Sequence, residues 1–404
     1  MKTLRMYYQE NLMDAVTEKE LQDRMARVRV FLKDRGLAAV LIFLPGHEGY
    51  RQWLAGTLKQ GDQAEGAVLL GLEGPVYSYQ SNGCVPPGEE NTPFSGGIPP
   101  APADFTCVRA LPRLDVRDIE RCFAQAGGLR QLGVVHPAPV NARLWDELNR
   151  LLCDVEWVDV TGELAMVKGV VSPLEREIWS VNTRWMDQTF QGVCAMLTEG
   201  RTEYDIAREI TYVARRLGSG GEFVSLTAPV RVCSGQQGEK PAEAPFAFPG
   251  RRLREGDRIN IRAWITFHSF YRTTLSRMWT LGPAAEQTRL RWQAALTAQQ
   301  LAADRLTPGA TLEDVAASVN ASLREWGLPE ARNLFLHGLG YEPEQRPCQF
   351  DPSARLPLLD GTILAIEPLL DFGDEDPYCV GDPFIVTPGG AKRLSRLPRE
   401  IVEL

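Results

Sequence analysis

The same helix-starting pattern occurs twice in this chain, and segments typical of strands accompany each copy. TEGRTEYDIAREI (198–210) and TPGATLEDVAASV (307–319) each place a threonine, Thr202 or Thr311, ahead of two acidic residues, and a glycine follows each pattern at 218 or 327. A threonine oxygen can cap a helix, acidic residues are favourable in its first turn, and glycine readily ends it. The repeat therefore indicates an internal duplication of a helical unit associated with strands.

The N-terminal part shows a different order, in which helices alternate with strands. Apolar residues recur at helical spacing over 17–36, and the continuous apolar run AAVLIFL (38–44) is typical of a strand covered on both faces. Similar alternation continues to about 160. We expect residues 1–160 to form an α/β domain, 161–173 to connect it onward, and 161–404 to contain a second domain.

Length and charge restrict the class of protein. A chain of 404 residues is comfortable for two domains, and its net charge of −8 argues against a general binder of nucleic acid or membrane surfaces. The N-terminus lacks a signal-peptide pattern, and no apolar window reaches about 18 residues, so we expect no membrane span. Eight cysteines without a CxxC pair predict reduced thiols in a cytoplasmic protein.

No Asp or Glu occurs from 258 to 285, although 24% of the chain is charged. This acid-free stretch, RINIRAWITFHSFYRTTLSRMWTLGPAA, predicts two paired strands. Arg262, His268, Tyr271 and Arg272 give it cationic and aromatic groups, and arginine can hold a carboxylate by two hydrogen bonds. Strand alternation does not show which face lines a cavity, and a solvated or core histidine is the alternative for His268. The stretch favours a site for an anionic or polar ligand.

Six segments of the second half, in order, resemble the creatinase/aminopeptidase P/prolidase family. They are MVKGVVSPLEREIWSVN, TEGRTEYDIAREI, REGDRINI, LHGLG, LPLLDGTILAIEP and VTPGGAKRLS, and YRQWLAG (50–56) resembles a segment of the family's N-terminal domain. The resemblance implies a pita-bread C-terminal domain, pseudo-symmetric and α+β, behind an α/β domain, commonly in a homodimer. Family members are metallopeptidases that cleave X–Pro bonds or metal-free creatinases that hydrolyse creatine.

The resemblance also implies where the five ligands of a dinuclear metal centre would stand. The two aspartates correspond to Arg262 or Ala263 and to Thr273 or Thr274, the histidine to His337, and the glutamates to Glu367 and a position near Gly381. Only two of the five positions, His337 and Glu367, carry a residue that can bind a metal ion in this way. An Arg guanidinium cannot lose its proton to become a ligand. We therefore expect no metal and no other cofactor.

His337 and Glu367 are the predicted catalytic residues. His337 lies in the HGLG turn, and histidine can transfer protons near neutral pH; a histidine hydrogen-bonded for structure is the alternative. Glu367 lies in the apolar segment TILAIEPLL, where a carboxylate needs a cation or donor, so a role in function and a structural ion pair both stay open. Glu344 could orient His337 or bind a cationic group, and an exposed loop acid is its alternative.

The creatinase pattern is broken as well, because its catalytic His falls near Pro245 and its second-strand Glu near Ser276. We expect a metal-independent creatinase-like enzyme that hydrolyses a C–N bond of a small polar metabolite, with His337 as acid and base. The predicted substrate-binding residues are Arg262, His268, Tyr271, Arg272 and Glu344. A non-catalytic pseudopeptidase that acts as a binding protein is the alternative, and an X–Pro metallopeptidase is the third.

Overall fold

The computed structural model describes residues 16–44, 48–56, 66–79, 84–85, 105–135, 142–217, 230–236, 239, 250–267, 271–332, 335–340, 345–374 and 377–404. Two of the predicted site residues, His268 and Glu344, lie outside these ranges. The chain divides into two compact units, Asp14–Val167 and one that contains Lys168–Leu404. Within the described ranges, no helix is long and apolar enough to cross a membrane.

The N-terminal unit is built on a mixed six-stranded sheet of order β5-β3-β2-β1-β7-β8. The central strand β1 pairs antiparallel with β2 and parallel with β7, and its apolar residues pack with side chains of α4 and α5. The helices are α2 (Glu18–Asp34), α3 (Glu48–Ala55), α4 (Val116–Gln125) and α5 (Ala142–Leu151). The strands are β1 (Ala39–Leu44), β2 (Gly66–Gly71), β3 (Val76–Tyr79), β4 (Cys84–Val85), β5 (Val108–Leu111), β6 (Leu114–Asp115), β7 (Gln131–Val135) and β8 (Glu156–Asp159).

The boundary between the two units falls within the predicted connection at 161–173, and Thr161–Gly169 of this connection forms helix α6. Asp159 starts this helix: its Oδ1 accepts a hydrogen bond of 2.9 Å from the backbone N–H of Thr161. The segment then consists largely of Glu, Leu, Ala, Met and Lys, which have high helix propensity. This helix is short and has no clear amphipathic pattern, so hydrophobic periodicity in the sequence does not reveal it.

The first half of the C-terminal unit places two helices against a four-stranded sheet of order β20-β11-β10-β9. The predicted cap is present, since Thr202 accepts a hydrogen bond of 3.1 Å from Asp205 N. The predicted strand pair is present too, and β10 and β11 pair antiparallel over their whole length. The elements are α7 (Pro173–Gln191), a 3₁₀ helix (Val193–Met196), α8 (Glu203–Arg216), β9 (Val230–Gly235), β10 (Arg258–Thr266), β11 (Arg272–Thr280) and β20 (Val402–Glu403).

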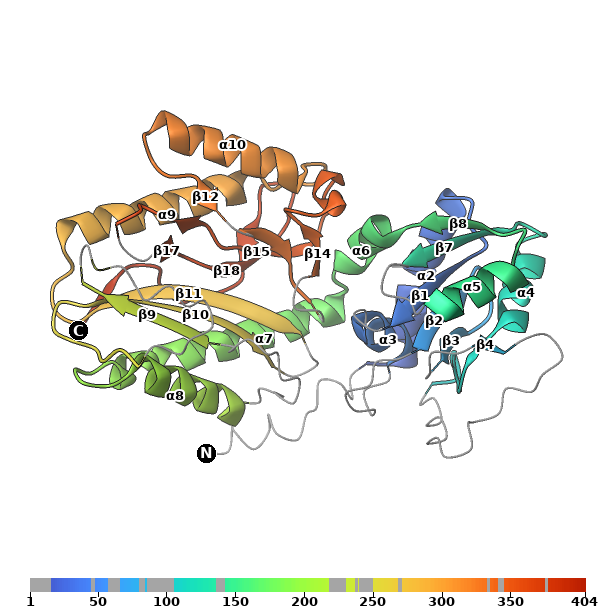
Figure 1. The fold of residues 1–404 in the computed structure, drawn as a ribbon, viewed down its shortest axis with the longest axis horizontal. Coiled ribbons are helices and arrows are strands. Elements are labelled where there is room, and N and C mark those ends of the chain that lie inside the picture. Colours follow the sequence, from blue (N-terminus) through green and yellow to red (C-terminus); the bar gives the residue numbers. More distant parts are fainter. Residues whose placement is uncertain are drawn as a thin grey trace. The chain divides into compact units, whose positions relative to one another are not determined.

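The second half repeats this arrangement with α9 and α10 and a sheet of order β14-β13-β15-β18-β19. Thr311 caps α10 by accepting a hydrogen bond of 3.1 Å from Asp314 N, as Thr202 caps α8. The elements are α9 (Glu286–Arg305), α10 (Leu312–Glu325), β12 (Ala331–Arg332), β13 (Leu336–Gly338), β14 (Gln345–Cys348), a 3₁₀ helix (Pro352–Arg355), β15 (Ile363–Ile366), β16 (Leu369–Leu370), β17 (Tyr378–Cys379), β18 (Asp382–Ile385) and β19 (Lys392–Arg393). The helix pairs α7–α8 and α9–α10 lie on opposite sides of the strands (Figure 1).

The two halves of this unit meet where β11 approaches β18. Ser276 of β11 forms an isolated bridge with Gly381, and the backbone N–H of Ser276 donates to the carbonyl of Gly381 at 3.0 Å. One face of β10 and β11 packs on α7 and α8 through Ile259, Ile261 and Leu275. The opposite face of the hairpin is therefore the one that meets the second half.

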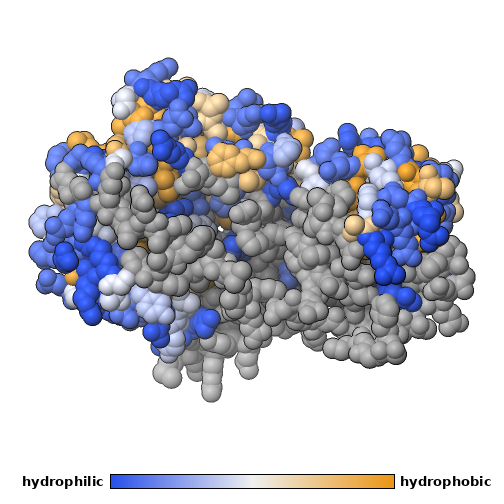
Figure 2. Space-filling view, in the orientation of Figure 1, coloured by the Kyte–Doolittle hydropathy of each residue, from blue (hydrophilic) through white to orange (hydrophobic). Residues whose placement is uncertain are grey.

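Large exposed hydrophobic side chains of the C-terminal unit come from separate elements. Tyr212 of α8, Leu290 of α9 and Phe350 of the turn after β14 are each more than half exposed. On the face drawn in Figure 2, hydrophilic residues are interspersed with hydrophobic ones over the described surface of this unit. Singly exposed apolar residues of this kind are normal for folded proteins.

Candidate functional site

The register of β10 and β11 determines which side chains face the second half of the unit. Arg262 pairs with Ser276 and Trp264 pairs with Thr274, and paired residues of antiparallel strands share a face. Ala263 pairs with Leu275 on the opposite, core-facing side. Of the alternatives that the sequence left open for the two aspartate positions, Arg262 and Thr274 are therefore the ones that stand on the face of the site.

The carboxylate of Glu367 lies against this face and is almost completely buried, at 3% relative exposure. Its Oε1 accepts a hydrogen bond from the hydroxyl of Thr274, and its Oε2 accepts one of 3.3 Å from the indole N–H of Trp264. Nε2 of His337 lies 3.3 Å from the same Oε2. The cost of burying the charged group is thus offset by three polar contacts with β10, β11 and β13.

His337 reaches Glu367 because their strands are neighbours: β13 pairs antiparallel with β15, and Glu367 follows β15 directly. The other ring nitrogen, Nδ1, lies 3.0 Å from the carbonyl oxygen of Gly338. Each ring nitrogen therefore lies near an oxygen atom of the protein. The two predicted catalytic residues form one buried pair.

Electrostatics favour an ionised Glu367. Burial alone raises the pKa of Glu367, but the hydrogen bond and charge of His337, the charge of Arg262 and the Thr274 hydroxyl together bring this pKa below the ordinary value of a glutamate. Burial raises the pKa of the nearby Cys379 thiol to about 11, so this thiol is neutral at pH 7. Glu367 is then the anion that Arg262 and His337 share.

Arg262 is the unusual member of the site. Its guanidinium carbon lies 4.8 Å from the centre of the Trp264 ring, and its buried Nε has no hydrogen-bond partner within the described residues. The side chain as a whole is partly exposed. The charge of Arg262 is one of the causes that lower the pKa of Glu367.

Gly381 closes the side of Glu367 that faces β18. A Cβ atom added at Gly381 would lie 2.6 Å from Oε1 of Glu367, 3.2 Å from its Cγ and 3.2 Å from the Cβ of Ser276. Real side chains do not approach so closely, so a side chain here would displace the carboxylate. The position that the resemblance assigns to the last glutamate is thus occupied by backbone in contact with the first.

The residues present do not fit a dinuclear metal centre. Hard divalent ions need several carboxylate oxygens, and the described residues contain no group of three or more His, Cys, Asp or Glu side chains able to hold a metal ion. Within that part of the chain, His337 and Glu367 are the two ligand types that remain, and both already contact protein groups.

Tyr271 lies away from the Glu367 site. Its hydroxyl donates to Glu175 Oε1 at 2.7 Å, and its ring packs edge-on against Trp179, so Tyr271 belongs to the start of α7. Arg272 pairs with Thr266 and so shares the strand face of Trp264 and Thr274, and its backbone N–H donates to the carbonyl of Gly340 at 2.9 Å. Arg277 forms a buried ion pair of 2.6 Å with Asp382. The structure therefore brings together Arg262, His337 and Glu367.

The sequence analysis missed Trp264 and Asn260. Trp264 reads as one apolar residue of an apolar strand, and its role depends on an indole N–H that points at Glu367. The side-chain amide of Asn260 donates at 3.0 Å to the carbonyl of Cys379. Alternation was an available signal, because Asn260, Arg262 and Trp264 are consecutive residues of one strand face, but choosing that face needed the register with β11.

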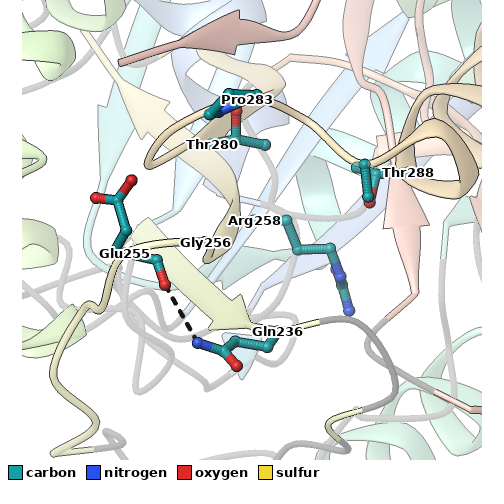
Figure 3. A pocket seen from close by; sticks show the side chains of 8 residues that line it. Gln236, Glu255, Gly256, Arg258, Thr280, Pro283 and Thr288 are labelled. Atoms are coloured by element: carbon teal, nitrogen blue, oxygen red, sulfur yellow. Dashed lines mark hydrogen bonds between the residues drawn. The ribbon is translucent and has the colours of Figure 1, made fainter.

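A polar pocket of about 440 Å³ lies at the other end of β10 and β11. It is lined by Gln236, Glu255, Gly256, Arg258, Thr280, Pro283, Ala285 and Thr288. Figure 3 shows the amide of Gln236 directed at the backbone oxygen of Glu255, to which it donates at 3.2 Å. Arg258 is six residues from Trp264, or about 20 Å along an extended strand, so this pocket is separate from the Glu367 site.

Comparison with known proteins gives relatives that are named as peptidases. "Probable dipeptidase PepE" of Mycobacterium tuberculosis is 28% identical over 330 residues, which cover 74% of this chain and 84% of the relative. "Xaa-Pro dipeptidase" of Pyrococcus furiosus is 24% identical over 247 residues, covering 60% of this chain and 67% of the relative. These names overturn the prediction of a metal-independent hydrolase of a small polar metabolite, because they point to peptides and to metallopeptidases.

Solved structures share the fold. The dipeptidase PepE of Mycobacterium ulcerans superposes with a TM-score of 0.72 at 23% identity, over 96% of this chain and 99% of that chain. The Xaa-Pro dipeptidase of Bacillus anthracis gives a TM-score of 0.70 at 17% identity, over 95% and 100%. The predicted α+β pita-bread architecture is confirmed.

The C-terminal unit carries the family signature. The model of "Metallopeptidase family M24" matches residues 183–391, a little over half of the chain, and this range includes α8 to β18 and every described residue of the Glu367 site. The six segments that suggested the creatinase/aminopeptidase P/prolidase family lie in or around the same range. This chain therefore belongs to the metallopeptidase family M24.

Proposed function

We propose that this protein is a peptidase-type enzyme that acts on the C–N bond of short peptides, and that Arg262 binds a carboxylate of the peptide. Two lines of support lead to this substrate class. The chain belongs to family M24, and relatives that align with most of it are named as dipeptidases. The observation that carries the proposal is Arg262, a half-buried residue whose Nε has no partner in the described residues and which lies beside the buried, hydrogen-bonded carboxylate of Glu367.

The chemistry of Arg262 suits a carboxylate ligand. The Trp264 ring lies under the guanidinium, which fixes its plane and leaves N–H edges for a ligand. Arginine and carboxylate form two parallel charge-assisted hydrogen bonds, and the buried Nε is a donor without a protein partner in the described residues. A short peptide offers its C-terminal carboxylate to such a fork.

In this proposal, His337 is the proton-transferring group and Glu367 orients its ring. The pair is buried, and the backbone carbonyl of Gly338 holds the second ring nitrogen, so the imidazole has a fixed direction. In this proposal, Nε2 exchanges its 3.3 Å contact with Glu367 for one with the bound group, and the proton passes between Nε2 and that group. No step is assigned to a metal ion, since the ligand set does not fit a dinuclear centre.

The test compares dipeptides with their C-terminal amides. Binding is measured by calorimetry for a panel that includes Xaa-Pro dipeptides, and hydrolysis by chromatography of the released amino acids. Because hydrogen bonds to charged groups contribute about 1.5–3 kcal/mol, the free acids should bind about tenfold or more tightly than the amides. The substitution Arg262→Met should abolish this preference.

Arg208→Met is the matched control. Arg208 lies on α8, is exposed, and its guanidinium carbon lies 5.4 Å from the centre of the Tyr204 ring. Its substitution should leave the preference for free acids unchanged. Equal binding of acids and amides by the unmodified protein would contradict the role of Arg262, and binding without cleavage of any dipeptide would contradict the enzymatic part of the proposal.

A further inference from the structure

We infer that the Glu367 site is held together without divalent metal ions. In this inference, Arg262 occupies the position of a metal-ligating carboxylate, and its guanidinium supplies the positive charge that the metal ion would supply. This inference rests on the geometry of the site and is independent of the proposed action on peptides. It departs from the chemistry that the family name implies. Three separate features of the described residues lead to it.

The first feature is that both carboxylate oxygens of Glu367 already contact protein groups. A carboxylate offers about four lone-pair positions. Thr274 donates to Oε1, and Trp264 and His337 lie at 3.3 Å from Oε2. A metal ion would have to displace these neighbours, of which Thr274 occupies the place of an aspartate ligand. The protein itself therefore supplies the groups that satisfy this carboxylate.

The second feature is steric. Backbone at Gly381 contacts Glu367 so closely that an added Cβ would lie 2.6 Å from Oε1. The backbone of Gly381 is also held in place, because it exchanges hydrogen bonds of 3.0 and 3.3 Å with Ser276 and its carbonyl accepts from Arg277 at 3.0 Å. The space in which a second glutamate would approach the ion is thus closed by a fixed segment.

The third feature is charge. Arg262 lies on the strand face between Asn260, which contacts the carbonyl of Cys379, and Trp264, which contacts Glu367. A guanidinium stays protonated at any pH that the protein tolerates, and it repels a dication at short range. The same positive charge attracts Glu367. The positive charge that balances Glu367 is therefore supplied by a side chain of the protein, Arg262.

The first experiment measures metal binding directly. The full-length protein is equilibrated with Mn²⁺, Co²⁺ or Zn²⁺, the bound metal is counted by mass spectrometry, and thermal unfolding is recorded with each ion and with EDTA. We expect that no metal ion binds in a way that depends on Glu367. We also expect the Tm measured with each ion to equal the Tm measured with EDTA. One or two ions per chain that raise the Tm and are lost in Glu367→Gln would overturn the inference. Ions that still bind to the Glu367→Gln variant lie outside the site, and that result is consistent with the inference.

The second experiment tests the assignment of Arg262. The substitution Arg262→Asp restores a carboxylate beside His337 and Glu367, and we expect this variant to gain an ion that raises its Tm. Arg208→Asp makes the same change on the exposed surface of α8 and should gain none. A folded Arg262→Asp variant that binds no ion would overturn the assignment of Arg262 to the ligand position. If Arg262→Asp does not fold, the metal count on the unmodified protein still decides the inference. Neither experiment uses a peptide, so its result is separate from that of the proposed function.

Discussion

At the scale of single residues, the site is shaped as much by a missing side chain as by the polar groups. Gly381 has ordinary backbone angles, so it is not needed for a special conformation, and its Cβ position is what matters. The contact with Glu367 means that every larger residue competes with the buried carboxylate for the same space. The glycine therefore determines where Glu367 lies.

We predict that Gly381→Ala destabilises the protein by about 1–3 kcal/mol, because an extra methyl group in a closely packed interior forces side chains and backbone to shift. The measurement is thermal unfolding followed by fluorescence. Gly389→Ala is the control, since an added Cβ there meets no atom within 4 Å. Equal Tm values for the two variants would show that the carboxylate moves aside without cost.

How far the sequence could predict this site depends on the kind of residue. His337 and Glu367 were identifiable because a histidine in a Gly-flanked turn and a glutamate in an apolar strand are conspicuous, and the structure pairs them at 3.3 Å. Tyr271 was assigned to the ligand site from its place in the acid-free stretch, yet its hydroxyl bonds Glu175. Sequence gives the two faces of a strand but not the partner that covers each, and that partner comes from residues about a hundred positions away.

At the scale of elements, the start of α7 is tied to the start of β11. Ser172 and Glu175 form a capping box: Ser172 Oγ accepts from Glu175 N at 3.1 Å, and Ser172 N donates to Glu175 Oε2 at 2.8 Å. The other oxygen of Glu175 accepts from the hydroxyl of Tyr271. One buried glutamate therefore satisfies a helix terminus and orients the strand that supplies Thr274.

We predict that Ser172→Ala lowers the stability of the C-terminal unit by about 1 kcal/mol, the usual cost of losing a helix cap. Chemical denaturation followed by circular dichroism measures the change. Ser172→Thr keeps the hydroxyl and should retain most of the stability. A loss of the same size in both variants would indicate that packing at this position, rather than the cap, is responsible.

At the scale of the whole C-terminal unit, Arg277 connects segments that are far apart in the sequence. It forms a buried ion pair with Asp382 of β18, and its Nε donates to the carbonyl of Pro398 at 2.7 Å. Gln299 of α9 donates to the same aspartate at 3.0 Å. Through Arg277, the strand β11, the sheet of the second half and the segment before β20 share one polar network.

We predict that Arg277→Met destabilises the unit by about 3–5 kcal/mol, because it leaves Asp382 buried without its cation. Arg289→Met is the comparison: Arg289 of α9 forms an exposed pair with Glu403, and such pairs contribute about 0–1 kcal/mol. Denaturant unfolding measures both. The double variant Arg277→Met with Asp382→Leu should recover part of the loss, and an equally unstable double variant would show that the charge of Asp382 is not the cause.

The contact between Gly381 and Glu367 also bears on how this branch of the family can change over time. A glutamate introduced at 381 would collide with Glu367, and an aspartate at 274 would remove a hydroxyl donor and set a second negative charge beside it. Residues in contact do not change independently, so each reversal alone disturbs the carboxylate that the others would need. Installing carboxylates at 262, 274 and 381 therefore requires several substitutions made together.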